Sequence, residues 1–155
     1  METCVKKIRE LAAGLLEKGE VEKVIGFTEG TIAMATQPIA ITAAADVEKL
    51  TFTSTCGLNL ANYASKEKGK KIAVIAKGCD SRNLVTHIVE NQIKRENLYV
   101  IGVPCHGMVD KFAIAADMGS EITGFTEDGD TITVTTAEKE QTFDKSDVLR
   151  HNCKF

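Results

Sequence analysis

Two apolar segments that do not alternate with polar residues constrain the fold most. Residues 71–77 read KIAVIAK and residues 98–103 read LYVIGV, and a helical pattern follows each of them. Such strands are typical of a parallel sheet that helices cover on both faces, because neither face of the strand is polar. A third segment, residues 21–27, is expected to join the same sheet. The sequence therefore predicts an α/β fold, a three-layer domain with a mainly parallel sheet.

Apolar residues at helical spacing predict helices over residues 5–16, 81–94 and 107–118. Asp80 or Ser81 is expected to cap the second of these helices. The side chains expected to be buried against the sheet are Leu84, Ile88, Phe112 and Ala116. Residues 32–41 are expected to be extended at a sheet edge, because Pro38 cannot donate to a central ladder.

The pattern changes after residue 120. Residues 121–135 form two β-rich runs around an Asp-Gly pair, which supplies the backbone angles of a hairpin turn. Residues 141–143 are a candidate third strand. The expected organisation is an α/β domain over residues 1–120, a C-terminal β-hairpin extension of the same domain over 121–150, and a tail over 151–155. The length of 155 residues suits about one domain.

Charge and hydropathy exclude several partner classes. The chain has 19 Lys and Arg against 22 Asp and Glu, a net charge of −3, which argues against a nucleic-acid partner. No apolar run reaches the roughly 18 residues of a membrane span, so no membrane partner is expected. The first residues lack the pattern of a secretory signal, and we expect a cytoplasmic location.

Five cysteines need an explanation, and three of them share one setting. Cys56, Cys79 and Cys105 each follow a strand segment and precede a helical one. A helix N-terminus favours the thiolate, which is the form that binds iron–sulfur clusters and zinc. We therefore predict Cys56, Cys79 and Cys105 as metal ligands. Two alternatives stay open: each thiol is a small core residue, or Cys79 and Cys105 form a disulfide.

The two loops that follow the central strands, residues 77–82 and 102–108, are the candidate cofactor site. Ligands of open parallel sheets bind at the carboxyl ends of the strands. The residues predicted to contact a cofactor are Gly78, Asp80, Ser81, Arg82, Gly102, Pro104, His106 and Gly107. No catalytic residue is identified. Residues 26–30, GFTEG, lack a complete phosphate-binding pattern, and we interpret them as a turn.

Four segments occur in the same order in one known family. They are VIGF at 24–27, NLANY at 59–63, KGCDSR at 77–82 and GVPCHGM at 102–108. Over residues 20–110 the chain resembles the N-terminal domain of coenzyme F420 hydrogenase/dehydrogenase beta-subunit-like iron–sulfur proteins, which are relatives of formate dehydrogenase beta subunits. The resemblance implies electron transfer between redox partners in anaerobic metabolism. It also implies a following ferredoxin-type domain with 4Fe–4S clusters, and flavin in some relatives. Cys153 resembles the start of that missing domain.

The leading hypothesis is an electron-transfer module of an iron–sulfur oxidoreductase, with a 4Fe–4S cluster at the three loop cysteines. Its expected partner is a redox subunit or a ferredoxin-type domain. A second hypothesis is a non-catalytic docking or scaffold domain that presents the ferredoxin domain to partner subunits. A third is a flavin- or nucleotide-binding domain whose cysteines are incidental, although no residue motif supports FAD.

Overall fold

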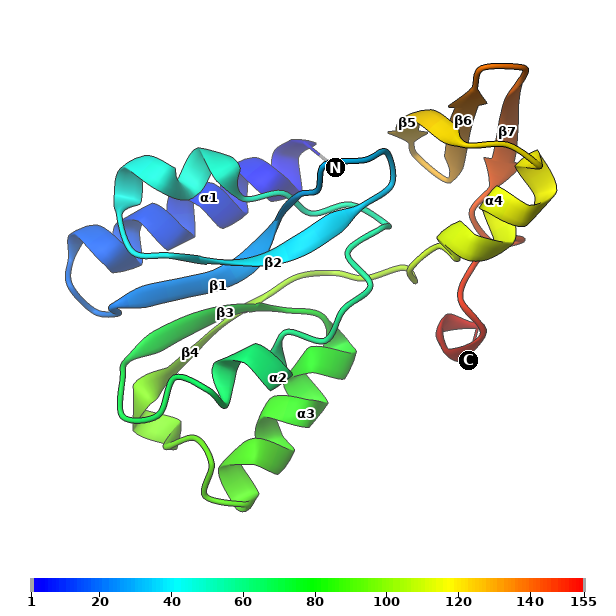
Figure 1. Ribbon diagram of the computed structural model, residues 1–155. Coiled ribbons are helices and arrows are strands. Elements are labelled where there is room, and N and C mark those ends of the chain that lie inside the picture. Colours follow the sequence, from blue (N-terminus) through cyan, green and yellow to red (C-terminus); the bar gives the residue numbers. More distant parts are fainter. Residues whose placement is uncertain (1, 155) are drawn as a thin grey trace. The chain divides into compact units, whose positions relative to one another are not determined.

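The computed structural model describes residues 2–154 (Figure 1), and their contacts group the chain into two compact units. The first unit consists of Met1–Thr28, Gln37–Phe52 and Leu58–Cys105. The second unit consists of Glu29–Thr36, Thr53–Gly57 and His106–Phe155. The domain ranges expected from the sequence stay predictions.

A four-stranded sheet forms the centre of the first unit. Its strands are β1 (Lys23–Glu29), β2 (Thr36–Ile41), β3 (Ile72–Ala76) and β4 (Leu98–Gly102), in the spatial order β2-β1-β3-β4. β3 pairs in parallel with β1 and with β4, and Ala76 of β3 lies opposite Gly102 of β4. The predicted α/β class and mainly parallel sheet are confirmed. Pro38 lies in β2 at the sheet edge, as its missing N–H group requires.

Helices cover both faces of this sheet. α1 (Glu2–Glu17) lies on one face, and α2 (Ala61–Ala64) and α3 (Gly78–Val89) lie on the other (Figure 1). Two short 3-10 helices, η1 (Ala44–Lys49) and η2 (Arg95–Asn97), complete the unit. Every residue of β3 is buried, which follows because its side chains point alternately toward the two helical layers.

Two details of the first unit differ from the predictions. α3 begins at Gly78 rather than at residue 81, because Lys77 takes the N-cap position and Asp80 lies within the first turn. β4 was expected to be fully buried, but Tyr99 and Val100 are exposed. β4 is an edge strand with no neighbour on its outer side, so helices cover it only in part.

The second unit contains an antiparallel sheet and one longer helix. Its elements are α4 (Lys111–Met118), β5 (Ile122–Asp128), β6 (Thr131–Thr136), β7 (Glu140–Asp144) and the 3-10 helix η3 (His151–Cys153). The predicted hairpin and its third strand are confirmed, and Gly129 adopts a positive φ of 54° in the turn. The buried core of this unit consists of Met34, Val109, Ile114, Met118, Ile132 and Val134.

The predicted apolar face of the third helix is wrong. Phe112 is 74% exposed and Ala116 is exposed, whereas Ile114 and Met118 are buried. The predicted helix began at residue 107 and therefore counted Met108 and Val109 as helical. This assigned the buried face of the helix to the wrong residues. The helix starts only after Asp110, and it packs in the second unit. In α3, Leu84 is buried as predicted, but Ile88 is only half-buried.

Over residues 2–154 no helix is long and apolar enough to cross a membrane.

Candidate functional site

The two predicted loops start at one edge of the parallel sheet. β3 ends at Ala76 and β4 ends at Gly102, which are paired residues, and the Val103 N–H donates to the Ala76 carbonyl at 3.0 Å. The carboxyl ends of β3 and β4 therefore lie side by side, as the strand pattern predicted.

A buried ion pair forms the base of the first loop. The Lys77 ammonium lies 2.9 Å from the Asp80 carboxylate, and the two side chains are 2% and 0% exposed. Lys77 Nζ also donates to the Leu58 carbonyl at 2.9 Å and lies 4.9 Å from the centre of the Phe27 ring. The ammonium is thus surrounded by a carboxylate, a carbonyl and an aromatic face, which together replace its hydration.

Asp80 uses both carboxylate oxygens inside the protein. Oδ2 accepts from the Lys77 N–H at 2.9 Å, and Oδ1 accepts from the Leu60 N–H at 3.0 Å. Asp80 was predicted to contact a cofactor, but in this arrangement it fastens the 58–60 segment to the start of α3. Lys77 was not predicted as its partner. The signal was present, because an acid three residues after an N-cap position commonly bonds back to the cap.

The remaining predicted residues of the first unit are accessible. Cys79 and Cys105 are both exposed thiols. Arg82, Gly102 and Pro104 are exposed and Ser81 is half-buried. A methyl group added at Gly78 would meet no atom within 4 Å, so the surface beside Cys79 is open. Cys79 therefore presents its sulfur next to an anchored turn.

Cys56 has a different environment, in the second unit. It is fully buried, and the Thr53 N–H donates to its sulfur at 3.3 Å. Among residues 2–154, no group of three or more His, Cys, Asp and Glu side chains is arranged to hold a metal ion. The assignment of Cys56, Cys79 and Cys105 as shared metal ligands stays a prediction.

Residues 148–150, which we call the strap, pair with residues 108–110 in the second unit. The Asp110 N–H donates to the Val148 carbonyl at 2.7 Å, and the Arg150 N–H donates to the Met108 carbonyl at 2.8 Å. Val109 and Leu149 form the antiparallel bridge between these two bonds.

The strap fills the spaces beside two loop glycines. Gly107 has a φ of +101°, and a Cβ there would lie 2.7 Å from Leu149 Cδ2. A Cβ at Gly57 would lie 2.4 Å from Arg150 Cζ, and Arg150 Nη1 donates to the Gly57 carbonyl at 3.0 Å. Gly107 was predicted to admit a cofactor, yet Leu149 lies against it. His106, also predicted, is exposed beside it.

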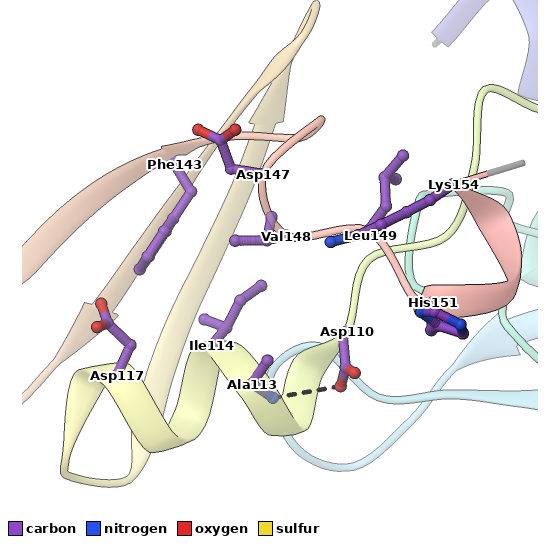
Figure 2. A pocket seen from close by; sticks show the side chains of 10 residues that line it. All are labelled: Asp110, Ala113, Ile114, Asp117, Phe143, Asp147, Val148, Leu149, His151 and Lys154. Atoms are coloured by element: carbon purple, nitrogen blue, oxygen red, sulfur yellow. Dashed lines mark hydrogen bonds between the residues drawn. The ribbon is translucent and has the colours of Figure 1, made fainter.

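A pocket of about 420 Å³ lies in the second unit between α4, β7 and the segment around the strap (Figure 2). Ile114 and Val148 contribute apolar surface, and charged residues lie around them. Asp110 accepts from the N–H groups of Phe112 and Ala113 at 3.0 and 3.2 Å, so it is the N-cap of α4. The other ionisable lining residues are Asp117, Asp147, His151 and Lys154. None of these residues was predicted from the sequence, although an aspartate before a helix is a recognisable cap signal.

Comparisons with known proteins bear on the whole arrangement. No family model matches the chain. Over 108 residues, which are 68% of the chain, it is 31% identical to the F420-dependent formate dehydrogenase 1 subunit beta of Methanococcus maripaludis. This similarity supports a beta-subunit-like domain. This result confirms the family resemblance that the loop segments indicated.

A solved structure shares the fold of this beta-subunit-like domain. A chain from the F420-reducing NiFe hydrogenase complex of Methanosarcina barkeri superposes on 94% of the domain with a TM-score of 0.60, at 16% sequence identity. The domain covers 56% of that chain and 28% of the formate dehydrogenase subunit. It therefore corresponds to one part of each of these longer subunits, and the comparisons support an oxidoreductase-related module.

Proposed function

We propose that this beta-subunit-like domain is the electron-transfer module of an iron–sulfur oxidoreductase. The observation that carries the proposal is the 31% identity over 108 residues with a subunit of an F420-dependent formate dehydrogenase. Electron transfer is the step that joins the oxidation of one substrate to the reduction of another in such an enzyme. The partner is then a redox subunit or a ferredoxin-type domain, and the module works in the cytoplasm.

The accessible thiols at the end of the parallel sheet are the groups through which the module would hold or approach a redox centre. Cys79 and Cys105 are exposed, and the buried Lys77–Asp80 pair fixes the turn that carries Cys79. The prediction adds Cys56 as a third thiolate. Three thiolates leave a 4Fe–4S cluster one ligand short, so a further group would have to complete the set. A cluster bound in this way would supply one-electron transfer.

Iron and sulfide analysis of the anaerobically purified chain tests this proposal. We expect bound iron and a visible absorption band, both of which fall in Cys56→Ser, Cys79→Ser and Cys105→Ser. Cys4→Ser is the matched control, because Cys4 lies on α1 outside the loops. Iron content that is independent of Cys79 would contradict the ligand assignment. A chain without iron would contradict the cluster itself.

A docking function is the second candidate, and the exposed apolar residues of the first unit favour it. Tyr99 and Val100 are exposed on the edge strand β4, and Val85 and Val89 are 58% and 75% exposed one turn apart on α3. Val85 and Val89 share one face of α3, and neighbouring exposed apolar side chains are typical of protein interfaces. The docking function predicts that Val85→Asp and Tyr99→Asp abolish binding to a purified partner subunit and leave the iron content unchanged. Unaltered binding by both variants would contradict it.

A further inference from the structure

A second cavity, of about 390 Å³, lies in the second unit and has no part in the proposed function. One wall is formed by residues 29–36, which are the β1–β2 loop and the strand residue on either side of it. Thr53 and Thr55 form another, and residues 123–125 of β5 form the third. Its size lies within the range of small-molecule sites. Three segments that are distant in sequence therefore converge on one cavity.

The loop that lines this cavity has a fixed conformation. The Gly30 N–H donates to the Ala35 carbonyl at 2.8 Å, and a Cβ at Gly30 would lie 2.8 Å from Ala35 Cβ, so only glycine fits there. Met34 has a left-handed φ of 56°, and its side chain is buried in the core of the second unit. Such a backbone persists only where its surroundings enforce it, and residues of this kind gather at ligand sites.

Polar groups point to the type of ligand. Within residues 2–154, the N–H groups of residues 31–34 and the Thr31 hydroxyl donate to no protein acceptor. Thr36 Oγ1 donates to the Thr55 carbonyl at 3.0 Å, and the hydroxyls of Thr53 and Thr55 lie 2.7 Å apart. These bonds hold two walls of the cavity together and leave the loop donors available.

The charge of the lining argues against an anion. Glu29 is the single ionisable side chain among the lining residues, which include no Lys, Arg or His. A carboxylate repels phosphate groups but accepts strong hydrogen bonds from hydroxyl groups. The ligand that fits this wall is neutral and donates hydrogen bonds.

The β5 wall adds an apolar surface. The pairing of β5 with β6 shifts register between Ile122 and Gly124, which is the irregularity of a β-bulge. Thr123 Oγ1 donates to the Thr135 carbonyl at 3.2 Å, and Phe125 lines the cavity beside it. Bulges often lie next to binding sites because they redirect a strand and its side chains. Phe125 of β5 and Ile32 of the loop add carbon surface to the lining.

We propose that this cavity binds a neutral, hydroxyl-rich ring, namely a furanose or pyranose sugar. Glu29 accepts hydrogen bonds from ring hydroxyls, and the N–H groups of residues 31–34 donate to the hydroxyl oxygens. Phe125 contacts the apolar face of the ring. The sugar is either free or part of a nucleoside, since both present the same hydroxyl chemistry.

Titration of the ¹⁵N-labelled 155-residue chain tests the proposal by amide chemical shifts. The three probes are D-ribose, adenosine and inorganic phosphate. We expect saturable shifts at residues 29–36, 53–55 and 123–125 with ribose or adenosine at millimolar concentration, and none with phosphate. Saturation by ribose identifies a free-sugar site, and saturation by adenosine alone identifies a nucleoside site. Saturation by phosphate alone, or by no probe, would overturn the proposal.

Two variants assign the contacts. Glu29→Gln and Thr31→Val remove groups that form no hydrogen bond within the described chain, so their amide spectra should show an intact fold. Each should weaken ribose or adenosine binding about tenfold, the effect of one lost hydrogen bond to a ligand. Thr142→Val is the control, because Thr142 is exposed on β7 and bonds to Thr133. Equal affinity in Glu29→Gln and the parent chain would refute the role of the carboxylate.

Discussion

Lys77 and Asp80 show how two charges are kept inside the first unit. Each side chain is almost fully buried, and each is surrounded by partners: a carbonyl and an aromatic ring for the lysine, and two N–H groups for the aspartate. Such a pair adds little net stability when complete, but the loss of one member leaves the other charge buried and unpaired. The pair therefore determines the position of the turn that carries Cys79.

Lys77→Met should lower the free energy of unfolding by about 3–5 kcal/mol, because the Asp80 carboxylate stays buried without its cation. Urea unfolding of the Lys77→Met variant and of the parent chain measures the difference. Lys49→Met is the matched control, since the Lys49–Asp46 pair is 60% and 44% exposed and should cost no more than about 1 kcal/mol. Equal losses in the two variants would contradict the buried pair.

Glu67 makes the stability depend on pH in the acid range. Hydrogen bonds from Lys23 and Lys70 lower the pKa of the Glu67 carboxyl below its ordinary 4.5. Above pH 4.5 the ionised Glu67 stabilises the folded chain. As the pH falls below 4.5 the unfolded chain binds more protons than the folded chain, so this stabilisation is lost as the pH passes through the lowered folded-state pKa. Glu67→Gln should flatten the acid side of the stability profile. Urea unfolding at a series of acid pH values measures this change.

At the scale of elements, α4 illustrates the importance of a helix start. Its buried face is carried by Ile114 and Met118, and Phe112 points to solvent. Ile114→Ala should lower the unfolding free energy by about 2–5 kcal/mol, because it leaves a cavity in the core. Phe112→Ala should change it by no more than about 0.5 kcal/mol. Thermal or urea unfolding of both variants measures the difference. A larger loss of stability in Phe112→Ala than in Ile114→Ala would favour the face expected from the sequence.

A helix or strand was predicted correctly where its sequence signal lies within a few adjacent residues. The strands β1, β3 and β4 and the hairpin of β5 and β6 were predictable, because unalternated apolar runs and an Asp-Gly turn are read from a few adjacent residues. The buried face of α4 was not predictable, because Met108 and Val109 continue the helical pattern of the sequence but lie outside the helix. Val109 pairs with Leu149 instead. The exposure of β4 depends on the absence of an outer neighbour, which the strand's own residues do not encode.

At the scale of the whole molecule, the strap is a contact between distant parts of the sequence. Gly107→Ala should lower the unfolding free energy by about 1–3 kcal/mol, because a φ of +101° is strained for alanine and Leu149 occupies the space. Gly14→Ala is a control with the opposite expected sign. Gly14 lies within α1 and a Cβ there would meet no atom within 4 Å, so this variant should raise the unfolding free energy by about 0.5–1 kcal/mol. A neutral Gly107→Ala would indicate that Leu149 does not occupy this space.

The candidate site was predictable only in outline. That two loops begin at neighbouring strand ends follows from the parallel topology, which the strand pattern indicated. The burial of Lys77 and the position of Arg150 against Gly57 did not follow from it. Arg150 and Gly57 are 93 residues apart, and nothing in either local sequence names the other. Asp80 and Gly107 also make internal contacts, and their cofactor contacts stay a prediction.

The interleaving of the two units has a consequence for synthesis on the ribosome. The second unit draws on Glu29–Thr36, Thr53–Gly57 and His106–Phe155. Met34 leaves the ribosome long before Ile114 and Ile132, its partners in the core. Domains fold as units once their sequence is available, so the apolar Met34 side chain stays exposed until the rest of the second unit has been synthesised. A chaperone that binds exposed apolar segments should therefore associate with nascent chains stalled at residue 105 and release those from which β7 has fully emerged.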